Sequence, residues 1–202
     1  KIVTKGRTIM KKKTLLIISM LVLVMFALTA CGGKKPSDVV EDNLKQVKTE
    51  NASSSVTKLF NDSSLEQKYG KDYEKFIKKV QDFDYEVKDE KVDGKKATVK
   101  VEIKTYDFGA AYKTTYDTVV SDAKSGKITA TTDVKDYVYN LMFQNLNSVK
   151  DKSYKKTVTI NCTKNDKGEW TTDINSNVDF LDAMMGGMFT AIKSVQAGQA
   201  AQ

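Results

Sequence analysis

The sequence contains no histidine and only one arginine, Arg7. Without histidine, the chain lacks the usual general base near neutral pH and the commonest metal ligand. It also cannot form the Ser-His or Cys-His pairs that activate a nucleophile. Arginine provides the forked hydrogen bonds that recognise phosphates and base edges, so its scarcity argues against nucleic-acid binding.

Cysteine is almost as scarce, with only Cys31 and Cys162. A terminal modification of Cys31, argued below, would leave Cys162 as the only free thiol. We therefore expect neither a disulfide nor a cysteine-ligated zinc site, and we predict no cofactor. Cys162 shares a strand face with apolar residues, which favours a small core side chain over a reactive thiol.

The charge of the chain is unevenly distributed. The net charge is +7, and the first thirty residues hold six basic residues and no acidic one. From Cys31 onward, 27 basic residues face 26 acidic residues, so this part is nearly neutral. The basic excess therefore belongs to the N-terminal segment and gives no support for a nucleic-acid partner.

That N-terminal segment has the layout of a secretory signal peptide over residues 1–30, with Met10 as its natural start. Three lysines precede an apolar run over residues 15–30, which ends in Leu28-Thr29-Ala30-Cys31. As a helix the run would span about 24 Å, which is short for a hydrocarbon core of about 30 Å. The last four residues resemble the lipobox of bacterial lipoproteins. We therefore predict lipidation at Cys31 and a lipid-anchored protein on the extracytoplasmic face of the cell membrane.

After a tether over residues 31–36, the periodicities predict one α+β domain over residues 37–195 and a flexible tail over 196–202. Asp107 and Asp133 are the expected caps of two of the helices, and Gly70 is a weak point in another. The expected helices follow the apolar positions of residues 37–47, 65–80, 108–123, 134–149 and 178–195, with a short apolar continuation over 56–60.

Two hairpins are expected from strict alternation, residues 83–87 with 97–103 and residues 158–162 with 170–174. Residues that lie opposite one another in a hairpin share a face, so apolar residues pair with apolar ones only if each loop has three residues. The first loop, with a bulge at Gly94, would set Val87 opposite Val99, and the second, residues 166–168, would set Ile160 opposite Ile174. Both hairpins have one apolar face, which predicts an antiparallel sheet with helices packed on that face.

The acidic side chains near the first hairpin lack the glycine and terminal glutamate of an EF-hand loop, so we predict no metal site. Asp82 opposite Lys104 and Glu86 opposite Lys100 would be ordinary cross-strand pairs. In the last helix, Gly186 and Gly187 indicate either a break or a close approach to another backbone. The methionines at 184, 185 and 188 could pack on the sheet or dock a partner.

Three segments carry a resemblance to a known family: Lys156-Thr157-Val158, Lys167-Gly168-Glu169-Trp170 and residues 181–187. They resemble uncharacterised surface lipoproteins of Gram-positive bacteria, and the order of elements is similar over nearly all of the chain after Cys31. The resemblance implies a cystatin-like fold, also called nuclear-transport-factor-two-like. It implies no catalytic residues.

Cystatin-like domains often bind small molecules between sheet and helices. The resemblance therefore makes a pocket possible around four aromatic residues, Tyr112, Tyr116, Tyr137 and Trp170. One enzyme class on this fold pairs tyrosine with aspartate for proton transfer. Asp117 and Asp136 adjoin tyrosines in sequence, but neighbours on a helix do not face one another.

The sequence thus favours a non-enzymatic binding or accessory role at the cell surface. The expected partners are the membrane, through lipidated Cys31, and either a small molecule or an envelope protein. The alternatives are a tyrosine and carboxylate proton-transfer enzyme, or a structural envelope protein with a large exposed apolar patch.

The lipid anchor can be tested by Cys31→Ala. Because acylation needs the thiol, we expect unprocessed precursor to accumulate and metabolic labelling with a radioactive fatty acid to disappear. Cys162→Ala is the control and should label normally. Continued labelling of the Cys31→Ala chain would rule out this anchor.

Overall fold

The structure is a computed structural model that describes residues 33–49 and 64–200. The expected signal peptide, Cys31 and the apolar stretch 56–60 lie outside these residues. Every helix and strand described belongs to one compact unit, Pro36–Gln202.

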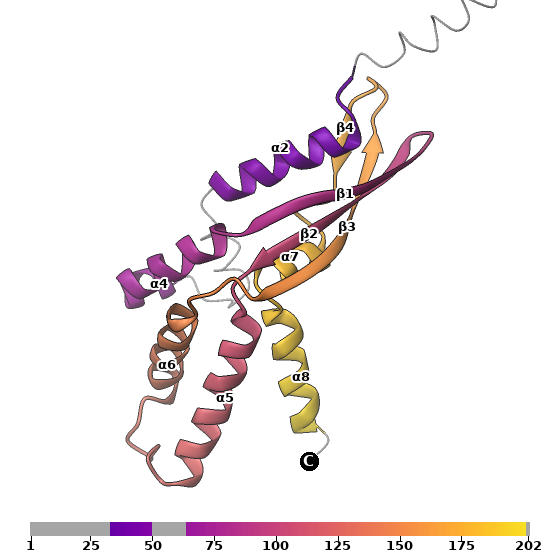
Figure 1. Cartoon of the computed structure of the whole chain (residues 1–202). Helices are drawn as coiled ribbons and strands as arrows, with labels where there is room; N and C mark the ends of the chain where they lie inside the picture. The colour runs from indigo at the N-terminus through magenta and orange to yellow at the C-terminus, as the bar shows by residue number, and fades with distance from the viewer. Residues whose placement is uncertain (1–32, 50–63, 201–202) are drawn as a thin grey trace, which may run out of the picture. The chain divides into compact units, whose positions relative to one another are not determined.

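The sheet has four antiparallel strands in the order β1-β2-β3-β4, namely β1 (Asp84–Asp93), β2 (Lys96–Thr105), β3 (Tyr154–Lys164) and β4 (Trp170–Thr172) (Figure 1). Alternation along β2 buries Val99, Val101 and Ile103 completely, whereas Lys100 and Lys104 are exposed. The predicted α+β class and the one apolar face of an antiparallel sheet are confirmed.

Six helices are described: α2 (Pro36–Thr49), α4 (Leu65–Gln81), α5 (Phe108–Lys124), α6 (Val134–Ser148), α7 (Val178–Met184) and α8 (Met188–Ala200). Helices α2 and α7 lie over the apolar face of the sheet, where they bury Leu44 and Phe180. The other four pack mainly on one another beyond the end of β2 (Figure 1). Only part of the helical content therefore covers the sheet as expected.

Local signals in the helices are confirmed. The Asp107 carboxylate accepts a hydrogen bond from the Ala110 amide at 2.8 Å, and Asp133 accepts one from the Asp136 amide at 3.0 Å. Both are N-caps, which satisfy otherwise unpaired amides of the first turn. Gly70 has a φ of +43° and kinks α4, as its position predicted.

The predicted loop of the first hairpin is wrong. Asp93 pairs with Lys96, so the turn has two residues, Gly94 and Lys95, and the register shifts inside β1 between Val87 and Glu90. Val87 therefore faces Val101, not Val99. The bulge places one extra residue in β1, and this keeps the apolar residues of both strands on one face. The turn itself can therefore be tight, with Gly94 at a φ of +57°.

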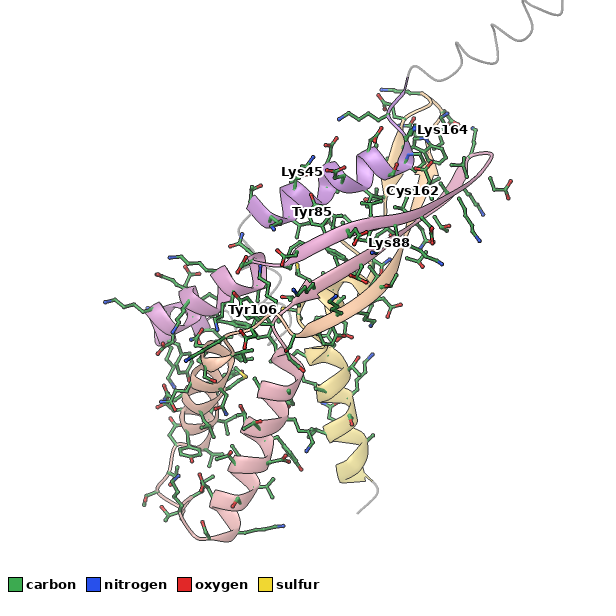
Figure 2. All side chains as sticks on the ribbon, in the orientation of Figure 1. Lys45, Tyr85, Lys88, Tyr106, Cys162 and Lys164 are labelled. Atoms are coloured by element: carbon green, nitrogen blue, oxygen red, sulfur yellow. The ribbon has the colours of Figure 1, made fainter. Side chains whose placement is uncertain are left out.

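The expected charge pairs on this hairpin are wrong for the same reason. Asp84, not Asp82, lies opposite Lys104, and Glu86 lies opposite Glu102. The Asp82 carboxylate instead accepts hydrogen bonds from Lys152 Nζ and from the Tyr106 hydroxyl, both at 2.7 Å. Figure 2 shows Tyr106 where β2 leads into α5.

The predicted register of the second hairpin is confirmed. Lys164 pairs with Trp170, and the Asn165 amide donates to the Glu169 carbonyl at 2.8 Å, which closes a three-residue loop over 166–168. Gly168 has the required positive φ of +83°. Strand β4 ends at Thr172, so Ile174 lies beyond it but is still buried.

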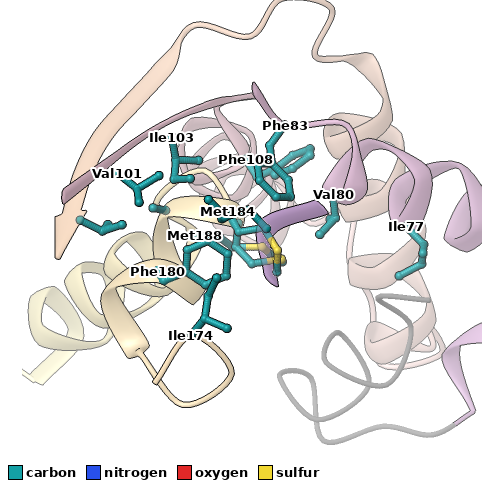
Figure 3. Close-up of a cluster of buried hydrophobic side chains, with 14 of the residues drawn as sticks. Ile77, Val80, Phe83, Val101, Ile103, Phe108, Ile174, Phe180, Met184 and Met188 are labelled. Carbon is teal, nitrogen blue, oxygen red and sulfur yellow. The ribbon is translucent and has the colours of Figure 1, made fainter. Parts of the chain in front are cut away.

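The core lies between the sheet and α7, with the side chains of α4 and α5 at its edge (Figure 3). Met184 and Met188 lie beside Phe180 under the β2 residues Val101 and Ile103, so these methionines pack as core. Cys162 is buried in the same core, and burial raises the pKa of its thiol to about 11. Such a thiol is unreactive near neutral pH, as the strand pattern indicated.

The predicted single helix over 178–195 is two helices, α7 and α8, and α8 continues to Ala200 where a tail was expected. Gly186 and Gly187 separate them, with φ of +55° and +75°. A Cβ on Gly186 would lie 2.0 Å from the Tyr106 carbonyl oxygen and 2.8 Å from the Phe108 nitrogen. Both readings of the glycine pair therefore apply, because the break makes the close approach possible.

Replacing Gly186 with alanine should strongly destabilise the fold. The Cβ would meet backbone atoms in a left-handed conformation, so we expect a loss of about 3 kcal/mol or more in unfolding free energy. Gly198→Ala is the matched control, because a Cβ there meets nothing within 4 Å. It should stabilise α8 by up to about 1 kcal/mol. Urea denaturation followed by circular dichroism measures both, and equal midpoints would refute the contact.

Candidate functional site

A groove of about 540 Å³ lies between α5 and α8. The two helices run side by side and in the same direction (Figure 1). Helix α5 contributes Gly109, Lys113 and Tyr116, and α8 contributes Thr190, Ala191, Ser194 and Gly198. These positions recur every three or four residues, so each helix turns one stripe toward the groove.

The groove is open because the side chains that α8 turns toward it are mostly small. Ala191, Ser194 and Gly198 of α8 line it, and Gly109 and Ala110 line it at the N-terminal end of α5. The Gly109 amide donates a hydrogen bond to the Gly186 carbonyl at 2.9 Å, which fixes the two helices at their N-terminal ends. Farther along the helices, short side chains leave the space between them open.

Tyr154, the first residue of β3, forms the wall at the N-terminal end of the groove. Its ring packs on Gly187, where a Cβ would lie 2.8 Å from Tyr154 Cε2. Burial raises the pKa of the Tyr154 hydroxyl, and the charge of Asp182 raises it further. Among the described residues this hydroxyl has no hydrogen-bond partner, so it is a neutral phenol available to a ligand.

Asp182 of α7 binds Thr190, one of the residues that line the groove. Asp182 is only 3% exposed, and its carboxylate accepts hydrogen bonds from the Thr190 amide at 3.1 Å and the Thr190 hydroxyl at 2.8 Å. Lys156 Nζ lies 3.1 Å from the same carboxylate. Burial alone would raise the pKa of Asp182, but the hydrogen bonds from Thr190 and Lys156 outweigh it and lower that pKa. The ionised carboxylate therefore caps α8 across the glycine break.

The four aromatic residues predicted for a pocket are not brought together. Tyr116 lines the groove, whereas Tyr112 on the same helix does not, and burial raises its pKa. The Tyr137 hydroxyl donates to Asp122 between α6 and α5. Trp170 lies at the start of β4, with Lys164 Nζ 5.4 Å from its ring centre.

Tyr154 and Asp182 were not among the residues predicted from the sequence. The one signal that could have located them is the Gly186-Gly187 pair, because close backbone approach and a helix break each require neighbours. Which residues those neighbours are depends on contacts between distant parts of the chain, so the sequence pattern could not name them.

Three tyrosines do form hydrogen bonds to carboxylates, but none of them lines the groove. Tyr69 donates to Asp136 at 3.2 Å, and Tyr106 donates to Asp82. Burial followed by Asp136 raises the pKa of Tyr69, and Asp82 followed by burial raises that of Tyr106. These phenols hold their protons more tightly than usual, so the bonds are better described as links between elements.

Within residues 33–49 and 64–200, no group of three or more acidic or cysteine side chains is arranged to hold a metal ion. In the same residues, none of the helices combines the length and the apolar character needed to cross a bilayer.

No family model matches the sequence, and no curated protein matches it. A solved structure, that of a putative lipoprotein (ycdA) from Bacillus subtilis, is similar with a TM-score of 0.41 and 15% sequence identity. The alignment covers 74% of this chain and 46% of that chain, so this chain spans less than half the length of that protein.

Removing the charge of Asp182 should weaken the fold. We expect Asp182→Asn to lower the unfolding free energy by about 2 kcal/mol at pH 7, because Lys156 loses its buried partner. Asp179→Asn is the control on the same helix, since Asp179 contacts the same lysine at 3.4 Å but is 78% exposed. It should change stability by less than about 0.5 kcal/mol.

The same pair of chains gives a pH test. Because the folded pKa of Asp182 is lowered, its contribution is present above the unfolded value of about 3.9 and is lost as pH falls through the folded pKa. The stability difference between the wild-type chain and Asp182→Asn should therefore shrink below about pH 4. Urea denaturation followed by the fluorescence of Trp170 measures it, and a difference independent of pH would contradict an ionised Asp182.

Proposed function

We propose that this protein is a lipid-anchored surface lipoprotein whose domain binds a small molecule in the groove between α5 and α8. The anchor rests on Cys31 at the end of the lipobox-like segment. The groove carries the binding role, because its volume lies within the range of about 300–1,000 Å³ typical of ligand pockets. Its lining is mainly apolar and includes the Tyr154 hydroxyl, which has no hydrogen-bond partner among the residues that the structure describes.

The cystatin-like fold is part of this proposal. A four-stranded antiparallel sheet with α2 and α7 over its apolar face supports it. The proposed ligand site differs from what the family resemblance implies. It lies between two helices, because Phe180, Met184 and Met188 fill the space between the sheet and α7.

A role without catalysis fits the groove better than proton transfer does. Among the described lining residues the one carboxylate, Asp107, already caps α5 through the Ala110 amide. The tyrosine hydroxyls that bond to carboxylates lie elsewhere. A structural envelope role is less well supported, because the exposed large apolar residues of the described chain, Val92, Val134 and Val178, belong to three different elements.

Filling the groove provides the test. We expect Ala191→Leu to abolish binding of small fragments that raise the melting temperature of the wild-type protein, because the larger side chain occupies the floor. Ala197→Leu is the matched control on the same helix, since Ala197 is exposed and lies outside the groove. It should bind fragments normally.

A thermal-shift screen of a fragment library against the three chains measures this effect. Fragments that bind Ala191→Leu as well as wild type would place the ligand elsewhere. The complete absence of stabilising fragments would argue against a ligand-binding role.

A further inference from the structure

We infer that the groove between α5 and α8 selects an uncharged amphiphile, a molecule with a slender apolar body and an uncharged, hydrogen-bonding head. This inference rests on the proposed binding role and adds the chemical class of the ligand. It follows from which charged groups and hydroxyl groups around the groove already have partners within the protein.

The helix ends at the head of the groove do not need an anion. Both α5 and α8 begin there, and a helix N-terminus usually attracts negative charge. Here the chain supplies that charge itself, through Asp107 on the Ala110 amide and Asp182 on the Thr190 amide. An anionic head would meet two carboxylates and two helix ends that are already capped.

The charged side chains of the lining are also compensated. Lys113 is the only cation among the described lining residues, and its Nζ lies 2.7 Å from the Asp117 carboxylate one turn along α5. Asp107 is the only anion there, and it is engaged as a cap. Asp182 behind the wall is neutralised by Lys156. A ligand charge of either sign would therefore lose water without gaining an unpaired partner.

Uncharged polar groups, by contrast, remain available. Tyr154 presents a protonated hydroxyl that has no partner among the described residues, and this group can both donate to and accept from an alcohol, ether or carbonyl oxygen. The Tyr154 ring packs against Gly187, where the absence of a side chain leaves room for it. The head of the ligand is expected at this wall.

The rest of the groove suits a narrow apolar body. Beyond Tyr154 the floor is formed by Ala110 and Ala191. Ser194 of α8 lies seven residues after Gly187, which precedes the helix, and this corresponds to about 10 Å of helix. A straight hydrocarbon chain can lie along this floor, whereas a bulky body would meet Tyr116 on one side and Val195 on the other.

Three probes with the same tail and different heads test the inference: octyl glucoside, octanoate and octylamine. Titration calorimetry at pH 7, below the micelle concentration, on the complete folded protein measures their affinities. We expect octyl glucoside to bind at least about tenfold more tightly than either charged probe. Ala191→Leu should abolish this binding, and Ala197→Leu should preserve it.

Tyr154→Phe examines the head contact. It should weaken octyl glucoside binding several-fold and leave octanoate binding unchanged, because only the hydroxyl is removed. Tyr112→Phe is the matched control, a half-buried phenol of α5 outside the groove. Its circular dichroism spectrum and its binding should both match the wild-type protein.

Each other outcome overturns the inference. Equal affinity for the three probes would show that the head is not selected, and preference for a charged probe would reverse the assignment. If no probe binds while Ala191-sensitive fragments do, the ligand class is wrong but the binding role survives. If no Ala191-sensitive fragment exists either, the proposed function fails as well.

Discussion

The contact on which the C-terminal half depends is a meeting of two backbones. The Gly109 amide donates to the Gly186 carbonyl at 2.9 Å, and the Gly186 Cα faces the Tyr106 carbonyl with no room for a side chain. Such a close approach requires glycine at both position 109 and position 186, and Gly186 also has a positive φ. It ends α7, starts α8 in a new direction, and sets the spacing of α5 and α8 at their first turns. The groove is a consequence of this geometry.

The glycine break leaves the N-terminus of α8 without a local cap, and Asp182 supplies one from the preceding helix. A buried carboxylate is costly unless its hydrogen bonds and charge are matched, and here Thr190 and Lys156 meet that requirement. Lys156 comes from β3, which also carries Tyr154. The first residues of β3 therefore contribute both Tyr154, which forms the wall of the groove, and Lys156, which binds the Asp182 cap of α8.

The predictable parts of this fold are those with local causes. The caps at Asp107 and Asp133 and the loop ending at Gly168 each depend on a few adjacent residues, so the sequence predicted them correctly. The bulge in β1 has no such signal, because Lys88 and Asp89 are ordinary edge-strand residues, and the first register was therefore wrong. In the site, Tyr116 was expected from the family resemblance, whereas Tyr154 lies 33 positions from the Gly187 that it covers. Contacts over that distance are set by tertiary packing, which no periodicity encodes.

The small residues of α8 are not explained by helix stability. Thr190, Ser194 and Gly198 all have poorer helix propensity than alanine or leucine, and all three line the groove. A leucine at any of these positions would favour the helix and cover apolar surface of α5. Stability alone would therefore close the space between α5 and α8, and an open groove beside a well-supported wall is more consistent with a requirement for access. The backbone contact at Gly186 thus serves the proposed binding role, because it sets the two helices apart and presents Tyr154 at the end of the space between them.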